Sequence, residues 1–327
     1  MRVTNSMLVN NYMHNLNNSM DRLSKLQTQL ALNRKFASIS DDPVSAIYSM
    51  QASFRLDRLE RYQKSVDMAQ NWLTQAETCV MEINDVYKSI YETVISAATD
   101  VNTDNDRAKM AEYVKQMRDH VLQTLNTSFG NKYIFAGYNT TGAYSAGLSQ
   151  TPFSADDDGH IWLNGVDLTA ASPGDADLML LQEEMLQFWV GNGLTMDVQI
   201  NGADLVGLGE DNLYSLLDNL YKVLTDTTGV PLDNMVEALQ PFITKLQDKQ
   251  EFLLAEAASI GGRANRLEMM ADRYTIDFLN YTQMKSNAED ADQAELIMWY
   301  KMAESVYKAA LSTGSYIIQQ TLMDFLR

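Results

Sequence analysis

The sequence predicts a mainly α-helical protein with a β-rich insert. Its N- and C-terminal helices are expected to pair in a coiled-coil or bundle rod, with the small β domain at the far end. Three observations predict this fold class: apolar residues recur at helical spacing at both chain ends, glycines and turn signals gather near the middle, and helical spacing then returns. Because an apolar helical stripe has to be buried, we expect a partner to cover each end.

The first predicted helix carries an apolar stripe with steps of four and three residues, and only Gln27 is out of pattern. The last part of the chain carries a second stripe at a seven-residue interval. Chain ends are usually frayed and polar, so we predict that the two stripes form an assembly interface. Its residues are Val9, Met13, Leu16, Met20, Leu23, Leu30, Leu296, Trp299, Ala303, Val306, Ala310 and Ile317.

A long helix is predicted to begin at Pro43. Asp42 can cap the free amide groups of its first turn, and proline fits the first helical position because no N–H is needed there. From Leu59 to Ala97, apolar residues alternate in steps of three and four without an error. This pattern is typical of a coiled coil or a long helical bundle.

The chain is then expected to reverse in the polar interval 100–106, and a helix around Val114 should pack back antiparallel. From Gly130 onward, glycines and prolines become more frequent. Turn and strand signals here predict a short strand at 133–137, an Asn-Gly hairpin at 161–168, a second hairpin at 198–202, and a short helix between Ala176 and Trp189.

Helical spacing returns from Leu213 to Leu224 and from Val236 to Tyr281, and Gly261-Gly262 is expected to loosen the second of these helices locally. The order is therefore helices, β insert, helices. We expect three domains: a terminal-helix domain of residues 1–42 with 285–327, a helical rod domain of residues 43–137 with 210–284, and a β-rich outer insert of residues 138–209.

Composition argues against several classes of protein. The formal net charge is −18 and the pI is near 4.5, whereas nucleic-acid binding needs clustered Lys and Arg. Cys79 is the only cysteine, so disulfide frameworks and cysteine zinc sites are excluded, and we expect a small buried side chain rather than a reactive thiol. No apolar run is long enough to span a membrane. The start, Met1–Ser6, lacks the apolar core of a cleavable signal peptide, so we expect any export to use another route.

No catalytic or cofactor site emerges from the motifs. The three histidines, His14, His120 and His160, lie in different segments without a second ligand at helical spacing, so we expect no metal site. The acidic run before Gly159 fails as an EF-hand, because Gly165 stands where a bidentate Glu is required. The remaining glycine clusters lack the residues of a P-loop or a dinucleotide fingerprint. We therefore expect no enzyme activity and no cofactor.

The two chain ends carry opposite charge. Residues 1–40 hold five Lys and Arg against one Asp, and residues 286–327 hold six Asp and Glu against three Lys and Arg. Opposite signs favour pairing of the terminal helices; ordinary solvated faces are the alternative. A helix laid on a single partner helix gains little against the backbone entropy of ordering it. We therefore expect both ends to be mobile in an isolated monomer and to order within an assembly.

Several stretches form recognisable motifs: Ser40-Asp-Asp-Pro-Val-Ser-Ala46, Asp106-Arg-Ala108, Arg118-Asp119, Leu125-Asn-Thr127, Tyr133-Ile-Phe-Ala-Gly-Tyr138, Pro152-Phe153, Ile260-Gly-Gly-Arg-Ala-Asn-Arg-Leu-Glu268 and the final Gln320-Thr-Leu-Met-Asp-Phe-Leu-Arg327. Together they resemble the flagellin superfamily and, within it, the hook-associated (FlgL-type) branch. The motif residues singled out are Asp41, Asp42, Pro43, Arg107, Tyr133, Phe135, Gly137, Gly261, Arg263, Asn265 and Arg266.

This resemblance implies a non-enzymatic structural subunit of the bacterial flagellum, secreted to the extracellular hook–filament junction. It implies unfolded passage through the type III flagellar export apparatus, with an export chaperone on the C-terminal helix, and assembly by terminal-helix packing. The implied partners are identical subunits in a junction ring, the preceding (FlgK-type) junction protein, and flagellin or the filament cap; neither nucleic acid nor membrane is implied. The alternatives are a flagellin, which is the filament subunit itself, and a cytoplasmic coiled-coil scaffold.

Overall fold

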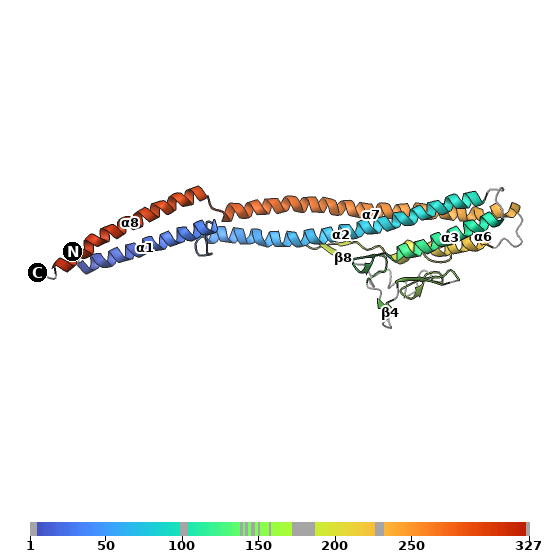
Figure 1. The fold of residues 1–327 in the computed structure, drawn as a ribbon, viewed down its shortest axis with the longest axis horizontal. Helices are drawn as coiled ribbons and strands as arrows, with labels where there is room; N and C mark the ends of the chain where they lie inside the picture. The colour runs from blue at the N-terminus through green and yellow to red at the C-terminus, as the bar shows by residue number, and fades with distance from the viewer. Residues whose placement is uncertain are drawn as a thin grey trace. The chain divides into compact units, whose positions relative to one another are not determined.

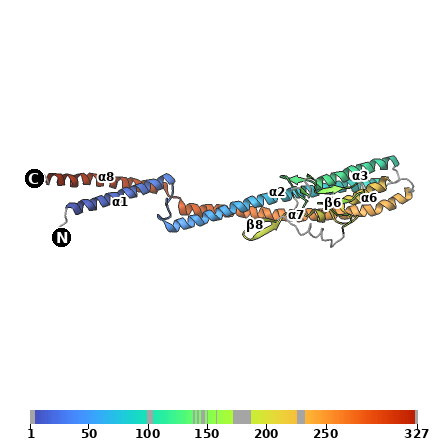
Figure 2. The same cartoon turned by 90° about the horizontal axis from the view of Figure 1, so that it is seen from below.

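The structure, a computed structural model, describes residues 5–98, 104–137, 140, 143–144, 148–149, 151–156, 158–171, 187–225 and 232–324. Long helices dominate it, and small antiparallel sheets occupy the middle of the chain (Figures 1 and 2). The predicted fold class is confirmed: the protein is mainly α-helical, it carries a β-rich insert, and its first and last helices pair.

The chain divides into two compact units. The terminal unit comprises Met1–Glu60 with Tyr274–Arg327, and the middle unit comprises Arg61–Arg273. Two long helices, α2 (Pro43–Ala97) and α7 (Leu232–Glu289), contribute residues to both units.

In the terminal unit, α1 (Asn5–Leu32) lies antiparallel to α8 (Gln293–Asp324). The Tyr12 hydroxyl donates a hydrogen bond of 2.9 Å to the carbonyl oxygen of Ala310. A Cβ on Gly314 would overlap the Tyr12 ring, so the absence of a side chain at Gly314 lets the two helices approach closely here.

The start of α2 follows the predicted cap. Pro43 is its first residue, and the Asp42 carboxylate accepts a hydrogen bond of 3.1 Å from the backbone N–H of Ser45. The carbonyl oxygen of Asp42 also accepts the first helical hydrogen bond, from Ala46. The side-chain bond satisfies an amide group that has no partner inside the helix.

In the middle unit, α2 lies beside α3 (Asp104–Leu125), α6 (Leu213–Thr225) and α7 (Figures 1 and 2). The stripe predicted on α2 is the core-facing one, since every member from Val66 to Ala97 is at most 2% exposed. The residues of this stripe are Val66, Ala69, Leu73, Ala76, Val80, Ile83, Tyr87, Ile90, Val94 and Ala97. Such continuous burial at helical spacing gives the middle unit a hydrophobic core.

The insert contains short strands: β1 (Ser128–Phe129), β2 (Lys132–Tyr133), β3 (Ala143–Tyr144), β4 (Leu148–Ser149), β5 (Phe153–Ala155), β6 (Ile161–Leu163), β7 (Val166–Asp167), β8 (Gln187–Gly191) and β9 (Leu194–Asp197). They form the pairs β1–β2, β3–β4 and β8–β9 and the three-stranded sheet β5–β6–β7, all antiparallel. The predicted Asn-Gly hairpin is β6–β7, with positive φ at Asn164 and Gly165, as its turn requires.

Two predictions for the insert are wrong. The strand expected at 133–137 ends at Tyr133; residues 134–137 instead form a buried bend, because their apolar side chains are consecutive and all enter the core. The hairpin expected at 198–202 is the start of a short helix, α5 (Gly202–Val206). There the Asn201 side chain caps the helix by accepting a hydrogen bond of 3.0 Å from the N–H of Ala203. An Asn-Gly pair is compatible with a helix cap as well as with a hairpin turn.

The helix expected between Ala176 and Trp189 lies mostly outside the described residues, and the described part, from Gln187, is strand β8. Helix α7 is continuous through Gly261-Gly262. Buried residues on both sides of the glycines, Ile260 and Leu267, explain this, because tertiary packing outweighs the low helix propensity of two glycines.

Candidate assembly interface

The seam between α1 and α8 contains most of the predicted interface residues. Half-buried side chains on α1 lie at Val9, Tyr12, Leu16, Ser19, Leu23, Leu26, Gln29 and Leu30, and those on α8 at Leu296, Tyr300, Ala303, Glu304, Tyr307 and Ala310. The steps of three and four residues are those of a paired-helix seam. The side chain of Ile317 lies outside the described residues.

Four predicted interface residues are not covered by this pairing. Met13 and Met20 are 45% and 56% exposed on α1, and Trp299 and Val306 are 37% and 55% exposed on α8. The true seam passes through Leu26 rather than Gln27, which explains why Gln27 broke the predicted stripe. The seam therefore leaves additional apolar side chains on the outside of the helix pair.

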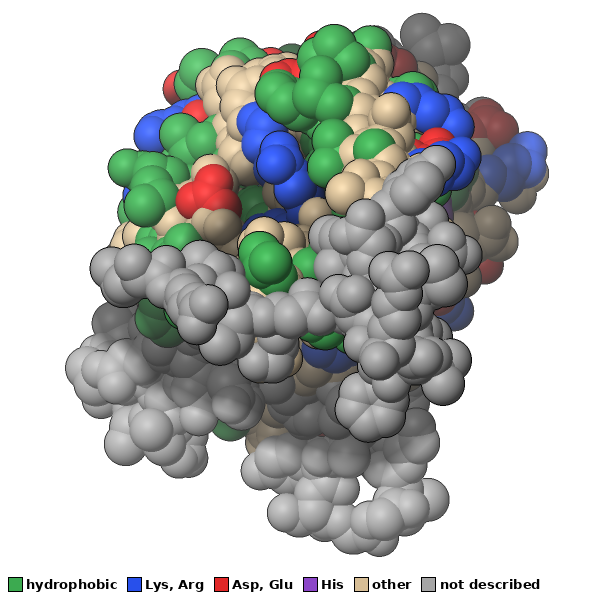
Figure 3. Space-filling view, turned by 90° about the vertical axis from the view of Figure 1, so that its left-hand side faces the viewer, with side chains coloured by type: hydrophobic (Ala, Val, Ile, Leu, Met, Phe, Trp, Pro, Cys, Tyr) green, Lys and Arg blue, Asp and Glu red, His purple; other side chains and the backbone are tan. Residues whose placement is uncertain are grey.

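The terminal unit has very little hydrophobic core. Among its described residues, the buried apolar side chains are Ala46, Ala52 and Leu59. Large apolar side chains face outward on α2, on the last turns of α7 and on α8; these include Val44, Ile47, Phe54, Ile276, Leu279, Met298 and Met302. Figure 3 views the molecule from the end at which α1 begins and shows hydrophobic side chains at the surface next to Lys and Arg. Exposed apolar patches of this kind mark interaction surfaces.

A groove of about 380 Å³ runs along one flank of the α1–α8 pair. The α8 side of the groove is apolar and is formed by Trp299, Met302 and Val306, with Ala303 also lining it. The α1 side is polar and is formed by Asn15, Asn18, Ser19 and Arg22. The groove therefore combines an apolar wall with hydrogen-bonding groups and one cation.

A buried carboxylate holds the connection between α1 and α2 against the end of α7. Glu289, whose side chain is 8% exposed, accepts a hydrogen bond of 2.8 Å from the Ser49 hydroxyl and pairs with Arg34 at 2.6 Å. Lys35 donates its backbone N–H to the Glu289 carbonyl at 2.8 Å. Segments far apart in sequence are thus fixed to one another by charge-assisted bonds.

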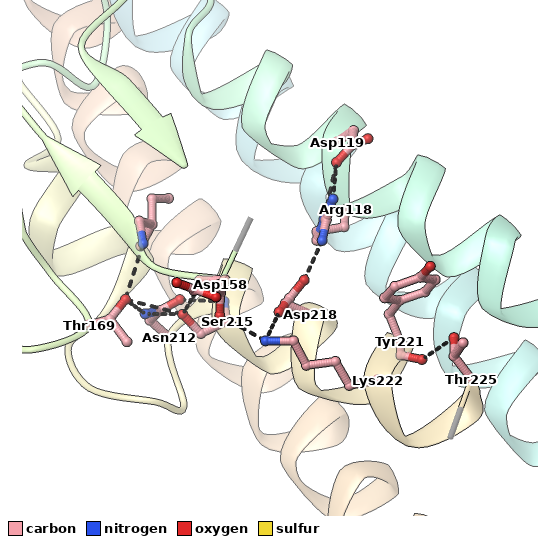
Figure 4. Close-up of polar contacts among 12 residues, drawn as sticks. Arg118, Asp119, Asp158, Thr169, Asn212, Ser215, Asp218, Tyr221, Lys222 and Thr225 are labelled. Atoms are coloured by element: carbon pink, nitrogen blue, oxygen red, sulfur yellow. Dashed lines mark hydrogen bonds and ion pairs between the residues drawn. The ribbon is translucent and has the colours of Figure 1, made fainter. Parts of the chain in front are cut away.

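A second polar cluster lies in the middle unit, between the insert and the helices (Figure 4). The carboxylate of Asp218 on α6, 3% exposed, pairs with Arg118 of α3 and, at 2.7 Å, with Lys222. The backbone carbonyl of Asp158 accepts a hydrogen bond of 2.8 Å from Lys222, and Gly159 accepts one of 2.7 Å from Ser215. Burial lowers the pKa of Arg118, but bonding to Asp119 and neighbouring charges outweigh it and raise the pKa overall.

This cluster connects the insert to α3 and α6. Gly159 has a φ of 90°, and a Cβ there would collide with the Asp218 carboxylate, so the loop can approach the ion pair only without a side chain. We find no group of three or more His, Cys, Asp or Glu suited to a metal ion in the parts of the chain that the structure describes.

The motif residues lie in three separate places. Asp41, Asp42 and Pro43 precede α2, where Lys25 pairs with Asp41 at 2.9 Å. Arg107 lies on α3, Tyr133 ends β2, and Phe135 and Gly137 lie in the buried bend that follows β2. Gly261, Arg263, Asn265 and Arg266 follow one another on α7. Of the last group, Arg263 lines a small cavity of about 170 Å³ with Asn201, Asp204 and Glu256. The motif residues therefore support the fold at several points and do not converge on one site.

Sequence reasoning missed the polar clusters. Asp218 could have been found as a single carboxylate within the apolar repeat of the helix at 213–224, since a charge at such a position needs a partner. Glu289 gave no such signal, because it stands among acidic residues at a helix end.

Cys79 is buried as expected, and burial raises the pKa of its thiol, which disfavours the reactive thiolate. None of the described helices is long and apolar enough to cross a membrane.

Comparison with known proteins relates this arrangement to a family. Residues 3–140 match the family model of the bacterial flagellin N-terminal helical region. Flagellar hook-associated protein 3 of Salmonella typhimurium is 23% identical over 320 residues, covering 96% of each chain. A flagellin of Aquifex aeolicus is 26% identical over 138 residues, which are 39% of this chain and 27% of the flagellin. The crystal structure of the flagellar junction protein FlgL from Legionella pneumophila superimposes with a TM-score of 0.57 at 12% identity, covering 75% of this chain and all of that one.

Proposed function

We propose that this chain is a structural subunit of the bacterial flagellum at the junction of hook and filament. The family model and the relatives bear out its resemblance to the flagellin superfamily and to the hook-associated branch. The observation that carries the proposal is coverage. Similarity to hook-associated protein 3 extends over 96% of both chains, whereas similarity to a flagellin is confined to 39% of this chain. A filament subunit is therefore the weaker candidate.

The terminal unit supports an assembly role on physical grounds. An isolated helix pair must bury apolar surface to offset the entropy of ordering its backbone, and this unit buries few large apolar side chains while exposing many. We propose that copies of the chain and adjacent flagellar proteins cover them. In this proposal the residues singled out on α1 and α8 whose side chains the structure describes act in two ways: the seam residues pair the helices, and the exposed ones contact neighbours.

The finer features of the proposal follow from the family. They are the three-domain division (1–42 with 285–327, 43–137 with 210–284, and 138–209), unfolded export with a chaperone on the C-terminal helix, contact with the FlgK-type junction protein and with flagellin or the cap, and an extracellular location. No catalytic activity is proposed. A cytoplasmic coiled-coil scaffold, the other alternative, would not need a compact β insert or terminal helices that order on assembly.

Deletion of the gene in the source bacterium, followed by electron microscopy, tests the proposal. Cells should keep hooks, lose filaments and release flagellin monomer into the medium, and the intact gene on a plasmid should restore filaments. Intact filaments in the deletion strain would contradict the junction role. Loss of hooks as well as filaments would place the chain at an earlier step.

A further inference from the structure

We infer that Asn192, at the tip of the β8–β9 hairpin, is a site of spontaneous deamidation in the folded chain. Its side-chain amide is converted to a carboxylate, and the product is aspartate or isoaspartate. The inference lies beyond the proposed function, because the reaction depends on the local structure of the hairpin and on water alone.

The chemistry is that of an asparagine followed by glycine, and asparagine is one of the thermally labile residues of proteins. The backbone nitrogen of the glycine gives up its proton and attacks Cγ of the asparagine. The bond from Cγ to the side-chain nitrogen breaks, and that nitrogen takes up a proton and leaves as ammonia. Water then opens the resulting succinimide ring at either carbonyl, so water is consumed, ammonia is released and nothing is oxidised. Glycine favours the attack, since it has no side chain to shield its nitrogen and its backbone adopts many dihedral angles.

The sequence contains three Asn-Gly pairs, at Asn164, Asn192 and Asn201. Because the reacting residues are the same in all three, the structure around each pair distinguishes them. For the ring to close, the asparagine side chain must rotate toward the next nitrogen, and the turn must change its dihedral angles. Bonds and contacts that prevent either movement protect the pair.

Hydrogen bonds hold Asn164 in place. Its Nδ2 atom donates a bond of 2.9 Å to the carbonyl oxygen of Ala136, and its backbone N–H donates one of 2.9 Å to the carbonyl oxygen of Pro152. The turn joins two strands of the three-stranded sheet β5–β6–β7. Attack on Cγ would require the side-chain bond to break and the turn to move away from Ala136.

Burial as well as bonding holds Asn201 in place. This residue is 8% exposed, and its Oδ1 atom accepts the capping bond of 3.0 Å from Ala203. A Cβ on Gly202 would collide with the carbonyl oxygen of Phe135. The backbone of Gly202 therefore has little room to rearrange in this close-packed region.

Asn192 lacks these restraints. Both Asn192 and Gly193 are exposed, and the ladder of the hairpin ends before them, at the pair formed by Gly191 and Leu194. No residue that the structure describes is hydrogen-bonded to the Asn192 side chain. Gly193 has a φ of 71°, and a Cβ there would meet no atom within 4 Å. The tip of the hairpin can therefore rearrange for the attack without disturbing packed neighbours.

Isoaspartate at this position would disturb the hairpin. In isoaspartate the main chain runs through Cγ, so the loop between Gly191 and Leu194 gains a carbon atom. Loop length and turn type set the register of a hairpin, and this register keeps Val190 and Met196 buried, at 0% and 8% exposed. In the part of the chain that the structure describes, β8 and β9 pair only with each other, and a two-stranded hairpin has little stability of its own. We therefore expect the modified hairpin to open more often.

Peptide mapping of the purified full-length chain tests the site. The chain is incubated at neutral pH, and chromatography with mass spectrometry measures the aspartate and isoaspartate formed at each Asn-Gly pair. We expect Asn192 to react at least about tenfold faster than Asn164 and Asn201, because those two can react only after local opening. The rate at Asn192 should rise with pH, since the attacking nitrogen must lose its proton. In denaturant the three rates should converge.

Two outcomes would overturn the inference. Similar rates at all three pairs in the folded chain would show that the contacts of Asn164 and Asn201 give no protection. A preference for Asn192 that persists unchanged in denaturant would show that the flanking sequence, and not the hairpin, selects the site. Neither outcome bears on the junction role, which gene deletion tests separately.

The variant Asn192→Gln provides the matched control for the effect on the hairpin. Glutamine keeps the amide at the same exposed position, but it must close a larger ring and therefore reacts far more slowly. After equal incubation, hydrogen exchange of the backbone at 187–197 should be at least about threefold faster in the wild type than in this variant, because the modified hairpin opens at a lower free-energy cost. Equal exchange in the two, once the wild type carries isoaspartate, would overturn the predicted disturbance of the hairpin.

Discussion

At the scale of single residues, His160 and Asp167 form an ion pair within the insert. The Nδ1 atom of His160 lies 3.0 Å from a carboxylate oxygen of Asp167. The hydrogen bond to Asp167 raises the pKa of His160 above its ordinary value of 6.5. Burial raises the pKa of Asp167, but bonds from His160 and from backbone amides outweigh it and leave the pKa below the ordinary 3.8.

The direction of these shifts fixes the pH range in which the pair stabilises the fold. The contribution of His160 is complete below its ordinary pKa and is lost as pH rises through the raised value; that of Asp167 is lost as pH falls through the lowered value. We predict that Asp167→Asn shifts the NMR titration of His160 to lower pH. Glu251→Gln, at an exposed position of α7, should leave that titration unchanged, and an equal shift in both variants would contradict the assignment.

Glu289 joins three segments of the terminal unit at the turn between α1 and α2. Its carboxylate bonds both Arg34 and Ser49, and loss of the charge weakens both bonds. We predict that Glu289→Gln speeds hydrogen exchange of the backbone at 33–42 by about fivefold, equivalent to about 1 kcal/mol. Mass spectrometry of peptides from this segment measures the change. Asp21→Asn, on an exposed position of α1, should have no such effect.

At the scale of elements, two glycines in different helices should respond oppositely to alanine. A Cβ on Gly202 would collide with the carbonyl oxygen of Phe135, whereas one on Gly262 would meet no atom within 4 Å. We predict that Gly262→Ala stabilises α7 by about 0.5–1 kcal/mol through helix propensity, and that Gly202→Ala destabilises the middle unit. Thermal unfolding followed by circular dichroism measures both, and a lower melting temperature for Gly262→Ala would refute the first.

The sequence predicted those elements whose signals are dense and repeated. In a long stripe such as the one through Ile83 and Tyr87, many residues at helical spacing indicate the same buried face, so the prediction does not depend on any single residue. The Asn-Gly pair, in contrast, occurs in two settings. At Asn164 it forms a hairpin turn, and at Asn201 the side chain caps a helix. The choice between them depends on tertiary contacts that the local sequence does not encode.

The pairing of α1 with α8 was predictable from composition, but the phase of the α1 seam was not. The stripe of α1 was assigned one residue away from the observed seam at Gln27, because Met13 and Met20 supplied an apolar alternative to Tyr12 and Ser19. Only the structure separates side chains that pair the helices from those that remain outside. The polar clusters at Asp218 and Glu289 join segments distant in sequence. The sequence marks Asp218 as a carboxylate that needs a partner, but it does not identify that partner, and it gives no signal for Glu289.

At the scale of the whole molecule, the two units should differ in stability. The middle unit buries continuous stripes of large apolar residues, and the terminal unit does not. We predict that in a dilute monomer the amides of 7–32 and 293–314 exchange at least about tenfold faster than those of 66–97, because their local opening costs less free energy. Hydrogen-exchange mass spectrometry would decide this, and equal protection of the two sets would contradict it.

The small core of the terminal unit has a consequence for thermodynamics. If neighbouring copies supply the missing burial, mass action governs the folding of this unit. Its ordering free energy then becomes more favourable by about 1.4 kcal/mol for each tenfold increase in protomer concentration, and its melting temperature rises accordingly. The middle unit, complete in itself, would melt at one temperature whatever the dilution. A calorimetric dilution series should therefore resolve two transitions, of which only one moves.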